Sequence, residues 1–318
     1  MVYGSAGENM GLKLNKRGII FTTLVIMILF LFLISLTFYS IIKDRQAIRD
    51  RVETMNSFIF SLEKDMERQV YISGYRAVLS IESYITETGN FVASSEDSIE
   101  EALLNGTINN QTVGLMEGYK LSEWQSRVSE LGSKVNTLIN YSIINVTVNH
   151  EDPWEISIRM RINISIRDKG NQSRWDKIHT IKTTIKIEGF EDPLYLLNTN
   201  GLISNQIKKT PYTIFVNGLD MSNLSAHTNN SYYKSSPAGP SFLDRLEGKT
   251  FANPNGIESL VNLERLSSQG IATSDKSIVD FIYFSSSNPA KCNVLPAGMP
   301  NWFKLDEDHL PTYQVDCA

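Results

Sequence analysis

Residues 19–42 read IIFTTLVIMILFLFLISLTFYSII, a run of 24 residues without a charged side chain. At about 1.5 Å of rise per residue, a helix of this length is about 36 Å long and can cross a hydrocarbon core of about 30 Å. A core helix of a soluble protein would carry a polar face, and a cleaved secretory signal would have an apolar stretch of only about 7–15 residues. The run therefore predicts a single transmembrane helix over residues 19–42, with membrane lipid as a partner.

The charges that flank this run do not decide its orientation. The positive-inside rule requires an asymmetry, but basic residues lie on both sides: Lys13, Lys16 and Arg17 before it, and Lys43, Arg45, Arg49 and Arg51 after it. The whole chain has 30 basic and 35 acidic residues and a net charge of −5. Because phosphate binding needs a surplus of Lys and Arg, we expect no nucleic-acid partner.

Asparagine glycosylation sequences favour an extracellular position for the part of the chain that follows the helix. Eight Asn-x-Ser/Thr sequences lie there, at Asn105, Asn110, Asn140, Asn145, Asn163, Asn171, Asn223 and Asn229. Such sequences are acceptors on the outside of a cell. The leader of residues 1–18 carries +2, so the remainder of the chain carries −7. We expect a single-pass protein with residues 1–18 in the cytoplasm and the body outside.

Two basic residues and a glycine stand directly before the apolar run, in the sequence Lys16-Arg17-Gly18-Ile19-Ile20-Phe21. This arrangement resembles the processing site of archaeal type IV pilin-like precursors. The resemblance covers the leader and the membrane helix, and it implies cleavage after Gly18, with Ile19 as the first mature residue. The fifth mature residue would be Thr23, where bacterial pilins have Glu. The alternative is a plain signal anchor that keeps its leader.

Residues 43–90 are expected to continue the membrane helix as a stalk. No Pro or Gly occurs between Lys43 and Ser73, and Gly74 is a position where the helix could bend. Apolar residues recur at steps of four and three: Ile48, Val52, Met55, Ile59, Leu62 and Met66. Such a heptad seam predicts contact with another helix, from a second copy or a pilin-like partner, or packing on the protein's own body.

Residues 91–190 predict helices followed by a three-stranded antiparallel sheet. Helices are expected from Ser94 to Leu104 and from Ser122 onward. From Trp154 to Ile166 every second residue is apolar, and the residues between them are polar, which is typical of a strand with one wet face. The same alternation precedes it at Ile144, Val146 and Val148. It also follows the turn 168–171, at Ile181, Thr183, Ile185 and Ile187.

Residues 191–318 predict a loop-rich α+β region, and the fold class of the whole chain is accordingly α+β. Strands are expected at Tyr212–Val216 and Ile278–Phe284, and a helical segment at Ile257–Leu266. Ser241 and Asp244 have the spacing of a capping box, with Gly248 closing a short helix. The polar segment Ser222–Pro240 is expected to be a mobile loop.

Cys292 and Cys317 are the two cysteines of the chain, and both lie near its C-terminus. In an extracellular domain this predicts a disulfide that fastens the C-terminal tail. A pair of unpaired or metal-binding thiols is the alternative. Pilin-like proteins often close a C-terminal loop in this way.

The remaining clusters of reactive side chains favour structural roles. Asp306-Glu307-Asp308-His309 is interpreted as a solvated acidic turn rather than a metal site with the cysteines. Glu188, Glu191 and Asp192 are interpreted as turn residues rather than a carboxylate pair for glycoside chemistry. The chain has no HExxH, CxxC, P-loop, G-x-G-x-x-G or G-x-S-x-G motif. We therefore expect no cofactor and no metal.

These features together predict a non-enzymatic cell-surface protein, a pilin-like subunit in adhesion or filament assembly. Its processing residues would be Arg17, Gly18 and Ile19. The first alternative is a membrane-tethered receptor or binding module that is not processed. The second is a tethered hydrolase.

Overall fold

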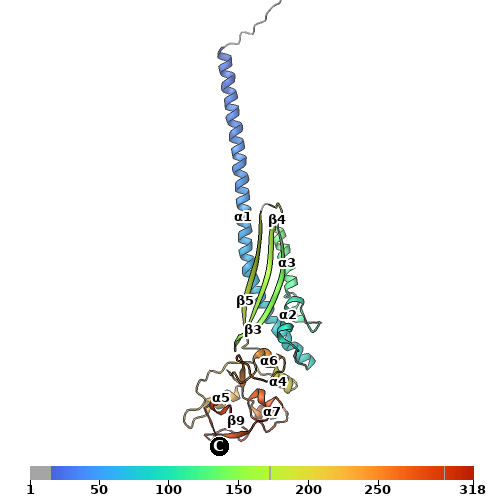
Figure 1. The fold of residues 1–318 in the computed structure, drawn as a ribbon, viewed down its shortest axis with the longest axis vertical. Coiled ribbons are helices and arrows are strands. Elements are labelled where there is room, and N and C mark those ends of the chain that lie inside the picture. Colours follow the sequence, from blue (N-terminus) through green and yellow to red (C-terminus); the bar gives the residue numbers. More distant parts are fainter. Residues whose placement is uncertain (1–15, 172, 297) are drawn as a thin grey trace, which may run out of the picture. The chain divides into compact units, whose positions relative to one another are not determined.

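The computed structural model describes residues 16–171, 173–296 and 298–318. The described chain belongs to the α+β class, as the sequence predicts, with one long N-terminal helix and several small antiparallel sheets (Figure 1). It divides into two units, which comprise the described residues up to Phe60 and residues 61–318. Residues 1–15 of the predicted leader lie outside the described residues.

The first unit is the N-terminal part of helix α1 (Lys16–Thr88). Its large apolar side chains from Ile20 to Ile42 are exposed, except for the half-buried Ile34. Within the described chain, α1 is the one helix that is long and apolar enough to cross a membrane. Of the predicted seam, Ile48 and Val52 are exposed, whereas Met55 and Ile59 are buried.

The second unit begins with the remainder of α1, residues 61–88. One side of this segment is buried: Leu62, Met66, Val70, Ala77, Val78, Ile81 and Ile85. The helix runs through Gly74, the position where it could bend, without a break. A Cβ at Gly74 would lie 2.4 Å from Ile158 Cδ1 and 2.8 Å from Ile185 Cδ1. Glycine allows close packing here, because the ends of two isoleucine side chains fill the space that a Cβ would occupy and would have to move for any other residue.

Three strands, β3 (Thr137–Asp152), β4 (Glu155–Asp168) and β5 (Arg174–Lys186), form an antiparallel sheet with β4 in the centre. The alternate apolar side chains of β4 are buried: Ile156, Ile158, Met160, Ile162, Ile164 and Ile166. The expectation that Ile144 faces the core is wrong, because a register shift between Ile143 and Asn145 leaves it 49% exposed. A bulge inserts one residue and so reverses the parity of the side chains.

Short elements lead from α1 to the sheet. They are α2 (Ser95–Asn105), β1 (Thr107–Ile108), β2 (Gln111–Thr112), the 3-10 turn η1 (Gly114–Met116) and α3 (Leu121–Lys134). The Ser94 side chain accepts a hydrogen bond from the Asp97 N–H and caps α2. Trp124 of α3 donates from Nε1 to Asp65 Oδ2 of α1 at 3.0 Å. The Tyr141 hydroxyl of β3 donates to the Leu121 carbonyl of α3 at 2.9 Å, and its ring packs against Trp124. Both α1 and α3 are thereby fixed to the sheet.

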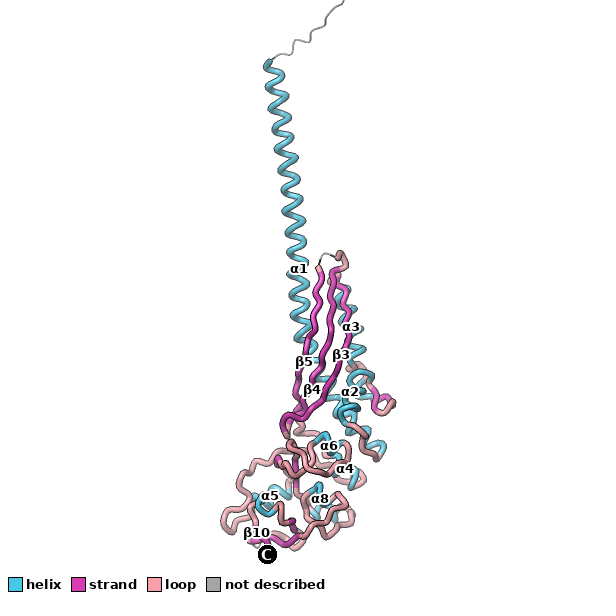
Figure 2. Tube along the Cα trace, viewed as in Figure 1, coloured by secondary structure: helices cyan, strands magenta, loops and turns pink. Residues whose placement is uncertain are grey.

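The C-terminal region consists mostly of loops with short helices and strands between them (Figure 2). Its helices are α4 (Pro193–Asn198), α5 (Ser222–Asn229), α6 (Phe242–Leu246), α7 (Leu263–Ser268), α8 (Asp280–Tyr283) and α9 (Leu310–Tyr313). Strands β6 (Tyr233–Ser235) and β7 (Ile257–Ser259) pair with each other. Strand β8 (Lys291–Leu295) lies between β9 (Lys304–Asp306) and β10 (Asp316–Cys317).

Several sequence predictions for this region are wrong. Ile278–Phe284 contains helix α8 rather than a strand, and Tyr212–Val216 forms no strand. Ile257–Leu266 begins as strand β7 and becomes helical only in α7. The expected loop Ser222–Pro240 contains α5 and β6. These segments are too short for apolar periodicity to separate helix from strand.

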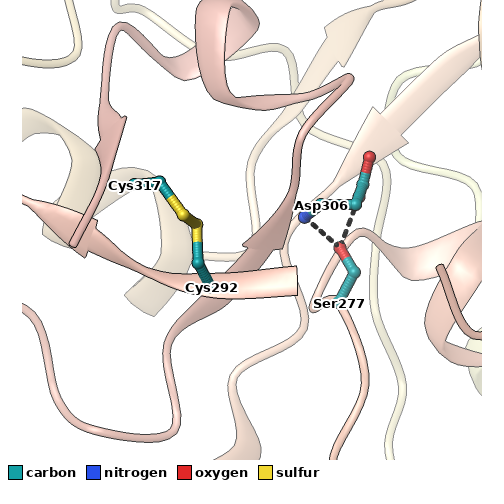
Figure 3. Close-up of a disulfide and its surroundings, with 4 residues drawn as sticks. All are labelled: Ser277, Cys292, Asp306 and Cys317. Atoms are coloured by element: carbon teal, nitrogen blue, oxygen red, sulfur yellow. Dashed lines mark hydrogen bonds between the residues drawn. A yellow bond between two sulfur atoms is a disulfide. The ribbon is translucent and has the colours of Figure 1, made fainter. Parts of the chain in front are cut away.

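Two local predictions are confirmed. Ser241 and Asp244 form a capping box in which each side chain accepts from the other's backbone N–H, and Gly248 follows with a φ of +72°. The Cys292–Cys317 disulfide joins β8 to β10, with 5.6 Å between the Cα atoms (Figure 3). The alternative of two unpaired or metal-binding thiols is thereby removed.

Candidate functional site

The predicted processing residues lie at the beginning of α1. Arg17, Gly18 and Ile19 are all helical in a helix that begins at Lys16. The apolar side chains that follow, from Ile20 on, are exposed.

A buried ion-pair network lies at the centre of the C-terminal region. Arg245 of α6 is fully buried and lies 2.6 Å from Asp192 Oδ2 and 2.9 Å from Asp280 Oδ2, both also buried. Tyr233 donates its hydroxyl proton to Asp192 at 2.7 Å, and Ser259 donates from N and Oγ to Asp280 at 3.0 and 2.8 Å. Burial raises the pKa of Asp280, whereas the Arg245 guanidinium opposes that rise. Glu188 lies in a turn, as predicted, whereas Asp192 caps α4 and pairs with Arg245 in the core, so the interpretation of Asp192 as a turn residue is wrong.

A second buried ionic cluster surrounds His309. Its Nδ1 lies 2.6 Å from Asp306 Oδ1, and its Nε2 lies 3.4 Å from Glu258 Oε2. Ser277 donates its hydroxyl proton to Asp306 Oδ2 at 2.6 Å (Figure 3). Burial alone would lower the pKa of His309, but its hydrogen bonds to Asp306 and Glu258 outweigh burial and raise the pKa to about 10.

The segment 306–309 is therefore not a solvated acidic turn as a whole. Asp306 and His309 are buried, and only Glu307 and Asp308 are exposed. Among the described residues, no group of three or more His, Cys, Asp and Glu side chains is arranged to hold a metal ion.

A polar pocket of about 520 Å³ lies where α2, the end of β3 and α6 meet. Its lining residues are Ala93, Ser94, Ser95, Glu96, Asn149, His150, Ser241, Leu243, Asp244, Glu247, Lys249, Asn253 and Asn255. Two of its three carboxylates have structural partners. Asp244 caps α6 and accepts from Asn253 Nδ2 at 2.7 Å. Glu247 accepts from the N–H and hydroxyl of Ser95 at 2.8 and 2.7 Å and pairs with Lys249.

The remaining ionisable groups of this pocket are Glu96 and His150. Burial and the neighbouring Glu247 raise the pKa of Glu96. Burial lowers the pKa of His150, whose Nδ1 lies 3.0 Å from the Asp152 carbonyl. No hydrogen bond joins His150 to Ser241 or Ser94 within the described lining, so these groups do not form a nucleophile–base pair. With its carboxylates, amides and hydroxyls, the pocket can bind a polar ligand by hydrogen bonds.

The eight glycosylation sequences lie at different depths. Seven of the asparagines are exposed: Asn105, Asn110, Asn140, Asn145, Asn163, Asn171 and Asn229. Asn223 is half-buried, and its Nδ2 donates to the Ile214 carbonyl at 2.8 Å. Accessibility therefore ranks Asn223 last as an acceptor.

Sequence reasoning did not identify the residues of the two ionic clusters, apart from Asp192 and the segment 306–309. The sequence does contain a feature that could have identified them. Arg245 and Asp280 are charged residues that stand among apolar residues, in Phe242–Leu246 and Ile278–Phe284. A charge within such a segment is buried only when it is paired.

No protein-family model, no curated protein and no solved structure matches the chain.

Proposed function

We propose that this chain is a membrane-anchored cell-surface protein, a pilin-like subunit that serves in adhesion or in the assembly of a surface filament. The observation that carries the proposal is helix α1. It is continuous from Lys16 to Thr88, exposed and apolar over residues 20–42, and packed on a sheet through Gly74. A filament subunit needs this combination, because its helix must leave the lipid bilayer and then pack against the same helix of other subunits.

The same proposal assigns a role to each part of the chain. Residues 43–90 act as a stalk, and the exposed seam residues Ile48 and Val52 face a partner helix from another copy or another pilin-like subunit. The meander sheet and the C-terminal region form an extracellular body. The disulfide between Cys292 and Cys317 supports this location, because disulfides persist in oxidising compartments.

Removal of the leader is the step that separates a filament subunit from a permanent anchor. Arg17 and Lys16 would otherwise have to enter an apolar bundle of helices, which costs several kcal/mol for each buried charge. Gly18 has no side chain and suits a protease that must approach the backbone closely.

The test is the mass of the N-terminus in the native host. We expect a chain that begins at Ile19, and we expect Gly18→Ile to retain the leader without changing the fold of the body. Gly11→Ile, in the same leader, is the matched control and should be processed normally. A native chain that still begins at Met1 would contradict the pilin-like mechanism.

The second candidate is an unprocessed membrane-tethered binding module, and the polar pocket beside α6 favours it. In that case the leader remains, Gly18→Ile has no effect, and ligand binding depends on Glu96 and Asn149. A tethered hydrolase receives less support from the same pocket, since Asp244 and Glu247 are engaged in structural hydrogen bonds.

A further inference from the structure

The side of the sheet opposite the buried isoleucines carries several exposed basic residues. Arg159, Arg161 and Arg167 of β4 are exposed there, next to Arg174 and Lys182 of β5. Glu151 pairs with Arg159 at 3.5 Å and also with Lys182. The Arg161 guanidinium has no ion-pair or hydrogen-bond partner within the described chain.

A hollow of about 430 Å³ lies in this face and crosses all three strands. It is lined by Asn145, Thr147, Arg159, Arg161, Ile178 and Thr180. The strand register explains the grouping, because Asn145 pairs with Arg161, Thr147 with Arg159, and Arg161 in turn with Thr180. Ile178 is 52% exposed and supplies an apolar surface within the hollow.

One wall of the hollow is a glycosylation sequence. Asn145 and Thr147 are both exposed, Val146 between them is buried, and the Asn145 amide has no hydrogen-bond partner within the described residues. The bulge before Asn145 places the asparagine and its threonine on the open face. A sugar ring has hydroxyl groups that can form hydrogen bonds with Arg161, Thr147 and Thr180. It also has an apolar C–H face that can pack against Ile178.

We infer that Asn145 carries an N-linked glycan whose first sugars occupy the hollow between Arg161, Thr180 and Ile178. The inference rests on the extracellular location of the body in the proposed function. It assigns one occupant, the chain's own glycan, to a hollow that contains the Arg161 guanidinium and an exposed isoleucine, Ile178.

The modification is a glycosyl transfer from a lipid-linked sugar phosphate. Asn145 Nδ2 forms a bond to the anomeric carbon of the sugar, and the bond from that carbon to the phosphate oxygen breaks. The phosphate leaves with the electron pair, and the amide nitrogen loses one proton.

The first experiment is glycopeptide mass spectrometry on the full-length protein from its native membrane. We expect modification at Asn145 that is lost in Thr147→Ala and kept in Thr147→Ser, since serine preserves the acceptor sequence. Ser165→Ala, which removes the Asn163 sequence, is the matched control and should leave Asn145 modified. An unmodified Asn145 in a protein modified at other asparagines would overturn the inference.

The second experiment tests whether the glycan occupies the hollow. Arg161→Ala and Ile178→Ser should each lower the Tm of the glycosylated protein by several degrees and leave the Tm of the Thr147→Ala protein unchanged. Equal shifts in both backgrounds would show that the glycan does not contact the hollow and would overturn this part of the inference.

Protease added to intact cells separates the failure of this inference from the failure of the proposed location. If the body is digested and Asn145 is unmodified, the inference fails and the location stands. If the body is protected until lysis, both fail.

Discussion

The sheet and the C-terminal region of the second unit are stabilised in different ways. The core beneath β4 consists of aliphatic side chains, with Ile156, Ile158, Ile162, Ile164 and Ile166 all fully buried. The C-terminal region also has an apolar cluster, but at its centre are charged residues, Arg245 between two aspartates and His309 between Asp306 and Glu258.

This difference reflects how the backbone polar groups of each part find their hydrogen-bond partners. Long strands satisfy their own backbone groups and need only apolar side chains on one face. Short helices and loops leave many backbone groups unsatisfied, and buried charged side chains can satisfy them over long sequence distances. Arg245, for example, donates to the Ile257 carbonyl and to Asp280, 35 residues away. We therefore expect the two parts to respond differently to substitution and to pH.

The largest effect is expected for Arg245→Met. It leaves Asp192 and Asp280 buried without their cation and should cost about 3–5 kcal/mol of unfolding free energy. Urea denaturation followed by near-UV circular dichroism measures this loss. The triple variant with Asp192→Asn and Asp280→Asn should recover part of it, because the buried charges are gone, and exposed Arg167→Met should change little. If the single and triple variants were equally unstable, packing rather than charge would dominate.

Ile162→Ala tests the aliphatic core, and we expect a loss of about 2–5 kcal/mol from the lost transfer energy and the cavity left behind. Ile162 is fully buried in the central strand, whereas Ile144 on β3 is 49% exposed, so Ile144→Ala serves as the matched control. The loss at Ile162 should be independent of pH between 5 and 9. A strong pH dependence would show that the sheet also relies on ionisable groups.

His309 should make the C-terminal region sensitive to alkaline pH. Its pKa in the folded protein, about 10, lies above the ordinary value of 6.5. The stabilisation is therefore complete below pH 6.5 and is lost as the pH rises toward 10. We expect the Tm of the native chain to fall over this range and that of His309→Gln to start lower and change less. Parallel Tm profiles would exclude this role for His309.

Glu82→Gln should stabilise the protein at alkaline pH, whereas the three substitutions above should destabilise it. Burial and the neighbouring Glu191 raise the pKa of Glu82 to about 9, so its carboxyl is protonated at neutral pH. Folding is then penalised increasingly as the pH rises from 4.5 to 9. The glutamine variant should match the native chain at pH 4 and be more stable than the native chain at pH 8, with a difference that grows as the pH rises. Exposed Glu87→Gln is the control, and a gain already present at pH 4 would contradict the explanation.

The same contrast explains what could be predicted from the sequence. Period-2 alternation over 154–166 and the capping residues Ser94, Ser241 and Asp244 are local signals, and each corresponds to an element of the structure. Helix α8 is different, because its first residue, Asp280, is held by Arg245, 35 residues away in sequence. The local sequence does not predict the bulge at Ile144 either, because Ile144 is apolar and continues the alternating pattern of the strand.

Of the candidate site residues, the cysteine pair could be predicted because the chain has only two. The polar pocket could not be predicted, because it joins three elements, α2, β3 and α6, that are distant in sequence. The hollow beside Asn145 could not be predicted either, since it depends on the register of β4 with both of its neighbours.

The missing side chain at Gly74 also affects how the protein responds to a pull along α1. An advance of one residue is a rise of about 1.5 Å with a rotation of about 100°. Such a slip would bring the side chain of Ser73 or Tyr75 toward the place where Ile158 and Ile185 now contact bare backbone. The helix segment 61–88 is thus held against sliding by the shape of its contact, and tension would have to separate helix and sheet before the two could move past each other.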